Sequence, residues 1–222
     1  VVRGGSGFKV FDAALENGGT VKALNAKGMA DLSRRELDAL GKYVAIYGAK
    51  GLAYFVMQPD GSIKSPITKF LSDDMVKAIC EATDAEVGDV IFFGADSHKI
   101  VNDSLGNLRL ELARKRNLID ESKFNLLWVT EFPLFEWSEE EKRYTAMHHP
   151  FTAPIEEDLE KYGDQLDKIR SRAYDIVLNG VELGGGSIRI HDRALQEKMF
   201  DLLGLSAVSY THLRAHETDS YL

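Results

Sequence analysis

The stretch that decides the fold lies late in the chain and reads Ala173-Tyr-Asp-Ile-Val-Leu-Asn-Gly-Val-Glu-Leu-Gly-Gly-Gly-Ser-Ile-Arg189. Two short β-type segments flank the dipeptide Asn179-Gly180, the strongest two-residue signal for a hairpin turn. The sequence therefore predicts an antiparallel hairpin, with strands at 173–178 and 181–184.

The pairing that follows from this turn brings two carboxylates together. Val177 is expected to pair with Glu182, Ile176 with Leu183 and Asp175 with Gly184. Asp175 and Glu182 would then lie on one face as diagonal neighbours, about 7 Å apart at Cα. Two carboxylates at that separation repel unless a cation or a shared proton lies between them. Hard oxygen ligands favour Mg²⁺, usually beside substrate phosphates. The alternative is a pair of solvated carboxylates on an exposed strand.

A glycine run and an arginine follow the second strand. Gly184-Gly185-Gly186 permits close approach of a ligand or of another backbone. The guanidinium of Arg189 suits a carboxylate or a phosphate. Strict alternation places Arg189 on the face opposite Glu182, so the two converge only if the glycines introduce a bulge or bend. The alternative is a floppy turn followed by a surface arginine.

The segment Met147-His148-His149-Pro150-Phe151 holds two adjacent histidines. Neighbouring side chains of an extended chain point in different directions, so the pair is not expected to bind one metal. We expect one packed ring and one functional ring, because histidine can donate a hydrogen bond to an anionic substrate and titrates near neutral pH. The alternative is a structural histidine in a loop.

The rest of the chain divides at the polar junction 117–123. Ser33 and Glu36 form a capping-box pattern that opens a helix with Leu37, Leu40 and Val44 on one face. Upstream of the junction we also expect strands at 8–11, 21–24, 53–57 and 90–93, a helix after Ser72, and a helix over 101–112. Downstream we expect strands at 126–130 and 134–137, a hairpin tip at 139–142, helical character within 152–168, and a helix over 193–204.

Composition limits the class of protein. The 222 residues are 44% hydrophobic and 28% charged, which is typical of globular chains. Residues 1–120 contain 16 Lys and Arg against 16 Asp and Glu, and residues 121–222 contain 11 against 19, which is the whole formal charge of −8. Since no apolar run approaches the roughly 20 residues of a membrane span, no membrane association is expected. The single Cys80 fits a reducing compartment and a place in the core, so we expect a cytoplasmic protein.

Several segments together resemble bacterial-type aspartyl-tRNA synthetases, in that family's order and over nearly all of residues 1–206. The histidine and glycine segments are the most specific of them. The matching segments are Ala49-Lys-Gly-Leu-Ala-Tyr54, Ile91-Phe-Phe-Gly-Ala-Asp96, Trp128-Val-Thr-Glu-Phe-Pro-Leu-Phe-Glu136, Ala146-Met-His-His-Pro-Phe-Thr152 and Gly180-Val-Glu-Leu-Gly-Gly-Gly-Ser-Ile-Arg-Ile-His191.

The resemblance implies an α+β fold and a layout of domains. Residues 1–120 would be a mixed α/β insertion domain, a module shared with a subunit of a tRNA-dependent amidotransferase. Residues 121–207 would be part of a class II catalytic domain, an antiparallel sheet flanked by helices. A tRNA-binding module of such an amidotransferase is the alternative function. The synthetase-type segments around His148, Glu182 and Arg189 argue against it, because a pure binding module has no need of them.

The resemblance also implies roles for individual residues. His148 and Arg189 would bind substrate aspartate, Glu182 would bind ATP and Mg²⁺, and Asp175 would be its metal-binding companion. The implied reaction joins L-aspartate to ATP, giving aspartyl-adenylate and pyrophosphate, and then transfers the acyl group to tRNA. No side chain acts as nucleophile or general acid–base, and the parent protein would be a homodimer.

The two ends depart from the family pattern. An arginine motif for the α-phosphate of ATP would lie upstream of Val1, and a last ATP-binding motif would follow the region 202–205. This chain alone is therefore expected to lack aminoacylation activity. Residues 208–222 instead resemble a translated sequencing-library adapter, so we expect a non-native tail there, and His212 and His216 are not expected to be functional.

Overall fold

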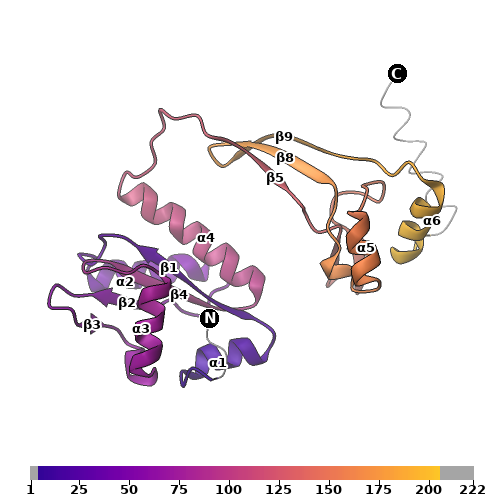
Figure 1. The fold of residues 1–222 in the computed structure, drawn as a ribbon. Helices are drawn as coiled ribbons and strands as arrows, with labels where there is room; N and C mark the ends of the chain where they lie inside the picture. Colours follow the sequence, from indigo (N-terminus) through magenta and orange to yellow (C-terminus); the bar gives the residue numbers. More distant parts are fainter. Residues whose placement is uncertain (1–4, 206–222) are drawn as a thin grey trace. The chain divides into compact units, whose positions relative to one another are not determined.

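The computed structural model describes residues 5–205, and contacts divide the chain into two compact units between Asp120 and Glu121 (Figure 1). The expected adapter-like tail, 208–222, lies outside the described residues. Both units combine helices with antiparallel strands, which confirms the α+β class. Among the helices of the described residues, none is both long and apolar enough to cross a membrane.

The first unit is built on one antiparallel sheet of four strands. In spatial order these are β1 (Thr20–Ala26), β4 (Val90–Asp96), β2 (Ala53–Met57) and β3 (Ile63–Lys64). The central strand β4 is buried on both faces, because Val90 and Phe92 join one hydrophobic cluster whereas Ile91 and Phe93 join the other. This alternation follows from the two-residue period of a strand.

Four helices supply the partners of those clusters. Helices α2 (Arg34–Ala45) and α4 (His98–Lys115) contribute Leu40 and Leu108 to one face of the sheet. Helices α1 (Lys9–Glu16) and α3 (Asp73–Ala82), together with the short η1 (Thr68–Phe70), lie against the other. The unit is therefore a sheet between two helical layers (Figure 1).

The capping box at the start of α2 is confirmed. The Ser33 hydroxyl accepts a hydrogen bond from the Glu36 backbone N–H, and the Glu36 carboxylate accepts one from the Ser33 backbone N–H at 2.8 Å. Leu37, Leu40 and Val44 are buried, as their helical spacing predicted. These two hydrogen bonds satisfy amide groups that would otherwise lack partners at the helix start.

The strand predicted at 8–11 is wrong, because this segment begins helix α1. Phe8 is the N-cap residue of this helix, and the centroid of its ring lies 5.0 Å from that of Phe11. Phe11 is buried and packs against Phe93 at 5.7 Å. Two aromatic residues in a short apolar run fit a strand or a helix equally well, and tertiary packing selected the helix.

Within its described residues, 121–205, the second unit contains two small antiparallel sheets and two α-helices (Figure 1). A three-stranded sheet has the order β5 (Leu126–Thr130), β8 (Ala173–Leu178) and β9 (Val181–Ser187), and β6 (Phe135–Ser138) pairs with β7 (Arg143–Ala146). Helices α5 (Glu156–Tyr162) and α6 (Arg193–Leu202) pack with η2 (Leu166–Lys168) and β6 around Ile169 and Met199. The helical character predicted within 152–168 and the hairpin tip predicted at 139–142 are thus confirmed.

Candidate functional site

The hairpin of β8 and β9 contains a β-bulge. The predicted pairing of Val177 with Glu182 is confirmed, but the pairing beyond it is wrong. Ile176 pairs with Gly184 rather than Leu183, and Asp175 pairs with Gly185. Leu183 is therefore the extra residue. A run of glycines favours such an irregularity, since it weakens the regular ladder on that side of the bulge.

The bulge decides which side chains share a face. From Gly184 onward the alternation of β9 is shifted by one residue, so Ser187 pairs with Ala173 and lies on the face of Asp175 and Glu182. Arg189 is two residues further along, and its Nη1 donates a hydrogen bond to Ser187 Oγ at 2.8 Å. Asp175, Glu182 and Arg189 are thus on one side of the hairpin, which we call the carboxylate face. The bulge that brings Arg189 to this face therefore lies at Leu183, rather than within Gly184-Gly185-Gly186, where it was expected.

Two of the three glycines have close neighbours. A Cβ atom added at Gly185 would overlap Asp175 Oδ1, and one added at Gly186 would lie 2.9 Å from the Tyr174 hydroxyl. A Cβ at Gly184 would meet nothing within 4 Å. The Asp175 carboxylate therefore lies directly over the backbone of Gly185, in space that any other residue would fill.

The two adjacent histidines have different surroundings. His148 is exposed, and its ring packs edge-on against the ring of Phe132, with the two ring centroids 5.0 Å apart. The ring of His149 contacts Phe151 and Arg189 instead. Its Nδ1 accepts a hydrogen bond from the Phe151 backbone N–H at 3.1 Å and lies 3.3 Å from Arg189 Nη1. The structure therefore brings His149 to Arg189, while His148 remains a predicted substrate contact.

Backbone pairing explains why His149 reaches Arg189. The Ala153 N–H donates to the Ile188 carbonyl at 2.8 Å, and the Ile190 N–H donates to the Phe151 carbonyl at 3.0 Å. From α6, Gln196 donates to the carbonyl of Pro150 at 2.9 Å. These contacts fix the histidine segment beside the end of β9. The adjacent histidines alone contain no signal that separates their roles, because the pairing joins segments about 40 residues apart.

An ionic cluster lies beside the segment that leads into β8. Asp158 is only 3% exposed and accepts hydrogen bonds from Arg170 Nε at 2.7 Å and Nη2 at 3.0 Å. Arg170 Nη1 also donates to Glu131 at 2.6 Å, just after β5. These hydrogen bonds from Arg170 lower the pKa of the Asp158 carboxyl. The cluster joins α5, the start of β8 and the turn between β5 and β6.

The donors on the carboxylate face are of the kind that Mg²⁺ prefers. Asp175 and Glu182 supply hard oxygen donors on one side of the hairpin. Within residues 5–205 no group of three or more His, Cys, Asp or Glu side chains is placed to hold a metal. Mg²⁺ commonly binds one or two carboxylates and completes its shell with waters and substrate phosphates. Two carboxylates therefore suit a site that a phosphate ligand would complete.

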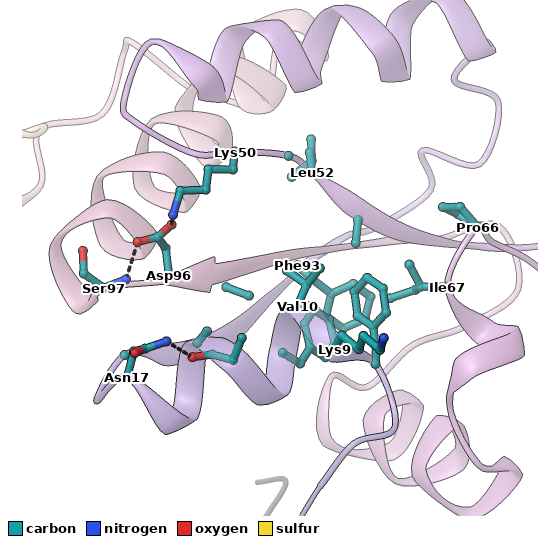
Figure 2. Close-up of a pocket in the computed structure, with 18 residues that line it drawn as sticks. Lys9, Val10, Asn17, Lys50, Leu52, Pro66, Ile67, Phe93, Asp96 and Ser97 are labelled. Carbon is teal, nitrogen blue, oxygen red and sulfur yellow. Dashed lines mark hydrogen bonds and ion pairs between the residues drawn. The ribbon is translucent and has the colours of Figure 1, made fainter.

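Each unit has a cavity among its described residues. In the first unit, α1, the segment before β2 and the end of β4 enclose about 810 Å³, which Figure 2 shows as mostly apolar around Val10, Ile67 and Phe93. The Lys50–Asp96 ion pair, at 3.4 Å, is at one side. The second unit has a hollow of about 270 Å³ whose lining includes His148, His149 and Arg143. Of these two cavities, the smaller adjoins the predicted site residue His148.

Comparison with known proteins identifies the relatives of both units. The family model described as the GAD domain matches residues 11–105, within the first unit. The aspartate–tRNA(Asp/Asn) ligase of Desulfosudis oleivorans is 54% identical over 210 residues, or 95% of this chain and 35% of that protein. The aspartate–tRNA ligase of Clostridium botulinum is 58% identical over 200 residues, or 90% of this chain and 33% of that protein.

A third relative extends the match further. The aspartate–tRNA(Asp/Asn) ligase of Lachnoclostridium phytofermentans is 51% identical over 216 residues, or 97% of this chain and 35% of that protein. The similarity thus runs through the GAD domain and through the hairpin of β8 and β9. The chain spans about a third of the length of these relatives, and it belongs to the aspartate–tRNA ligase family.

Proposed function

We propose that this chain forms part of an ATP-dependent ligase that activates L-aspartate as aspartyl-adenylate and transfers it to tRNA. Support comes from one observation above all: the bulge at Leu183 brings Asp175, Glu182 and Arg189 to one face of a glycine-lined hairpin. Opposite charges on one open face suit a substrate that has both a carboxylate and magnesium-bound phosphates. The first unit is the proposed insertion domain and the second is part of the proposed class II catalytic domain.

The proposed roles follow from the chemistry of each group. Arg189 binds the side-chain carboxylate of aspartate. Asparagine is rejected because its neutral side-chain amide would leave the positive charge of the guanidinium without an anionic partner. Glu182 and Asp175 would hold Mg²⁺. When this ion is bound, it neutralises part of the negative charge on the phosphates of ATP. His148 lies on the loop beside this face and contacts the bound amino acid. The adenylate forms through positioning and charge neutralisation rather than through a protein nucleophile.

The alternative function, a tRNA-binding module of an amidotransferase, would rest on the GAD domain alone. The relatives match 90% or more of the chain in the three cases above, including the whole hairpin. A binding module would have no need of the carboxylate face. The similarity beyond residue 105 therefore favours the ligase, with tRNA as the proposed macromolecular partner.

A chimera tests the ligase proposal. The segment of the Desulfosudis oleivorans ligase that aligns with this chain is replaced by this chain's residues, and aspartate-dependent ATP–pyrophosphate exchange is measured. Glu182→Gln and Asp175→Asn should each lower exchange by about tenfold or more and raise the Mg²⁺ requirement. Glu139→Gln is the matched control, because Glu139 lies on the β6–β7 turn and pairs with Lys142. Equal activity of Glu182→Gln and Glu139→Gln would refute the proposal.

A further inference from the structure

The contacts of the His149 ring fix its protonation. Two donors converge on the same nitrogen, since the Phe151 backbone N–H lies 3.1 Å from Nδ1 and Arg189 Nη1 lies 3.3 Å from it. Neither a backbone N–H nor a guanidinium N–H can accept a hydrogen bond. The Nδ1 atom must therefore be the unprotonated acceptor, which leaves the ring neutral with its proton on Nε2.

The same guanidinium nitrogen has a second acceptor. Arg189 Nη1 donates to Ser187 Oγ at 2.8 Å, and this hydroxyl lies 3.4 Å from the hydroxyl of Thr152, a residue only 2% exposed. Nη1 has two N–H bonds, and its two acceptors belong to different segments, His149 on the histidine loop and Ser187 at the end of β9. Two acceptors at fixed positions restrict the rotation of the guanidinium plane.

We propose that His149 is a positioning residue for Arg189, which it orients toward the substrate carboxylate by accepting a hydrogen bond at Nδ1. This inference rests on the proposed function, in which Arg189 binds aspartate. His149 acts through the guanidinium and does not itself touch the substrate. Preorganisation of the guanidinium lowers the entropy lost when a carboxylate binds in bidentate geometry. His148 cannot take this part, because its ring packs against Phe132.

Three substitutions in the chimera separate the acceptor from the bulk of the ring. In His149→Asn the amide oxygen is as many bonds from Cα as Nδ1 is, so the acceptor remains. His149→Gln moves the amide one bond outward, and His149→Leu removes the acceptor. We expect His149→Leu and His149→Gln to raise the KM for aspartate about tenfold, the scale of one hydrogen bond to a charged group. His149→Asn should stay within about threefold, and the KM for ATP should not change in any of them.

The Arg189→Leu variant distinguishes the two proposals. If Arg189→Leu leaves the KM for aspartate unchanged, the proposed role of Arg189 is overturned and the role of His149 with it. If Arg189→Leu raises this KM while His149→Leu matches the unsubstituted chimera, only the inference about His149 is overturned. Failure of His149→Asn to retain function, with losses equal to those of His149→Leu, would also overturn the acceptor role.

The tautomer offers a test that does not depend on activity. In the 222-residue chain labelled with ¹⁵N at histidine, long-range proton–nitrogen spectra distinguish protonated from unprotonated ring nitrogens. We expect an unprotonated Nδ1 and a protonated Nε2 for His149 near pH 7.5, assigned by comparison with His149→Asn. A proton on Nδ1 would overturn the inference even if every substituted enzyme failed to fold.

Discussion

Strands β4 and β5 have similar sequences and opposite surroundings. Val90-Ile-Phe-Phe93 is at most 3% exposed, whereas Leu126-Leu-Trp-Val129 is 36–61% exposed. The first is a central strand between two helical layers, and the second is an edge strand of a three-stranded sheet. An apolar run thus predicts that a strand forms, but neighbouring elements decide whether the strand is buried.

The difference extends to how each sheet uses its faces. In the first unit, side chains from four helices fill both faces of the sheet. In the second, one face of the β8–β9 hairpin holds Asp175, Glu182 and Arg189, and the Asp175 carboxylate lies over Gly185. Both faces of the first sheet are therefore packed with apolar side chains, whereas one face of the hairpin in the second unit carries charged side chains. Substitutions at matched positions of the two sheets can break or sharpen this distinction.

The largest effect is expected from truncation of the central strand. Phe92→Ala removes a fully buried ring and should lower the free energy of unfolding of the first unit by about 3–5 kcal/mol. The matched change in the second unit, Trp128→Ala, removes a side chain that is 61% exposed and should cost less than about 1 kcal/mol. Urea unfolding followed by far-ultraviolet circular dichroism measures both. Equal losses would show that β5 is buried in solution and would contradict the comparison.

The next effect separates two neighbouring glycines on β9. Gly185→Ala places a Cβ against Asp175 Oδ1 and should destabilise the second unit by about 1–3 kcal/mol through displacement of that carboxylate. Gly184→Ala is the control, because its Cβ would have no neighbour within 4 Å. Both tryptophans, Trp128 and Trp137, belong to the second unit, so fluorescence during urea unfolding reports on it. If the two variants unfold at the same midpoint, Asp175 does not lie over Gly185.

A smaller effect is expected at the start of α2. Ser33→Ala removes the hydroxyl that accepts from the Glu36 N–H and should cost about 1 kcal/mol. The loss should appear in circular dichroism as a shift of the first unit's transition. The midpoint of tryptophan fluorescence should not move if the two units unfold independently, and a parallel shift would show that they unfold together.

The last expected effect is confined to acidic pH. The hydrogen bonds that the Asp158 carboxylate accepts from Arg170 lower the pKa of Asp158. The ionised form of this carboxyl therefore stabilises the fold. That contribution is fully present above the ordinary value of 3.8 and is lost as pH falls through the lower pKa of the folded state. Asp158→Asn should therefore lose less stability than the unsubstituted chain between about pH 5 and pH 2. Urea midpoints from tryptophan fluorescence at several pH values measure this, and identical pH profiles would argue against the ion pair.

Local patterns predicted much of the fold. The Ser33–Glu36 capping box, the turn at Asn179-Gly180 and the strands at 53–57 and 126–130 depend on residues close together in the chain, and all are present. The segment 8–11 was predicted wrongly because a short apolar run with two phenylalanines fits a strand as well as a helix. Of the site, the shared face of Asp175 and Glu182 followed from alternation alone, since both are within four residues of the turn.

What the sequence determined by itself is therefore the set of elements, the hairpin turn and the chemical character of the residues around it. Only the tertiary structure decided that the bulge lies at Leu183, that Arg189 shares the face of Asp175, and that His149 rather than His148 reaches Arg189. The physical reason is how far apart in the sequence the interacting residues lie. Turns, caps and alternation depend on neighbours in sequence, whereas ladder register and burial depend on segments brought together only when the chain folds.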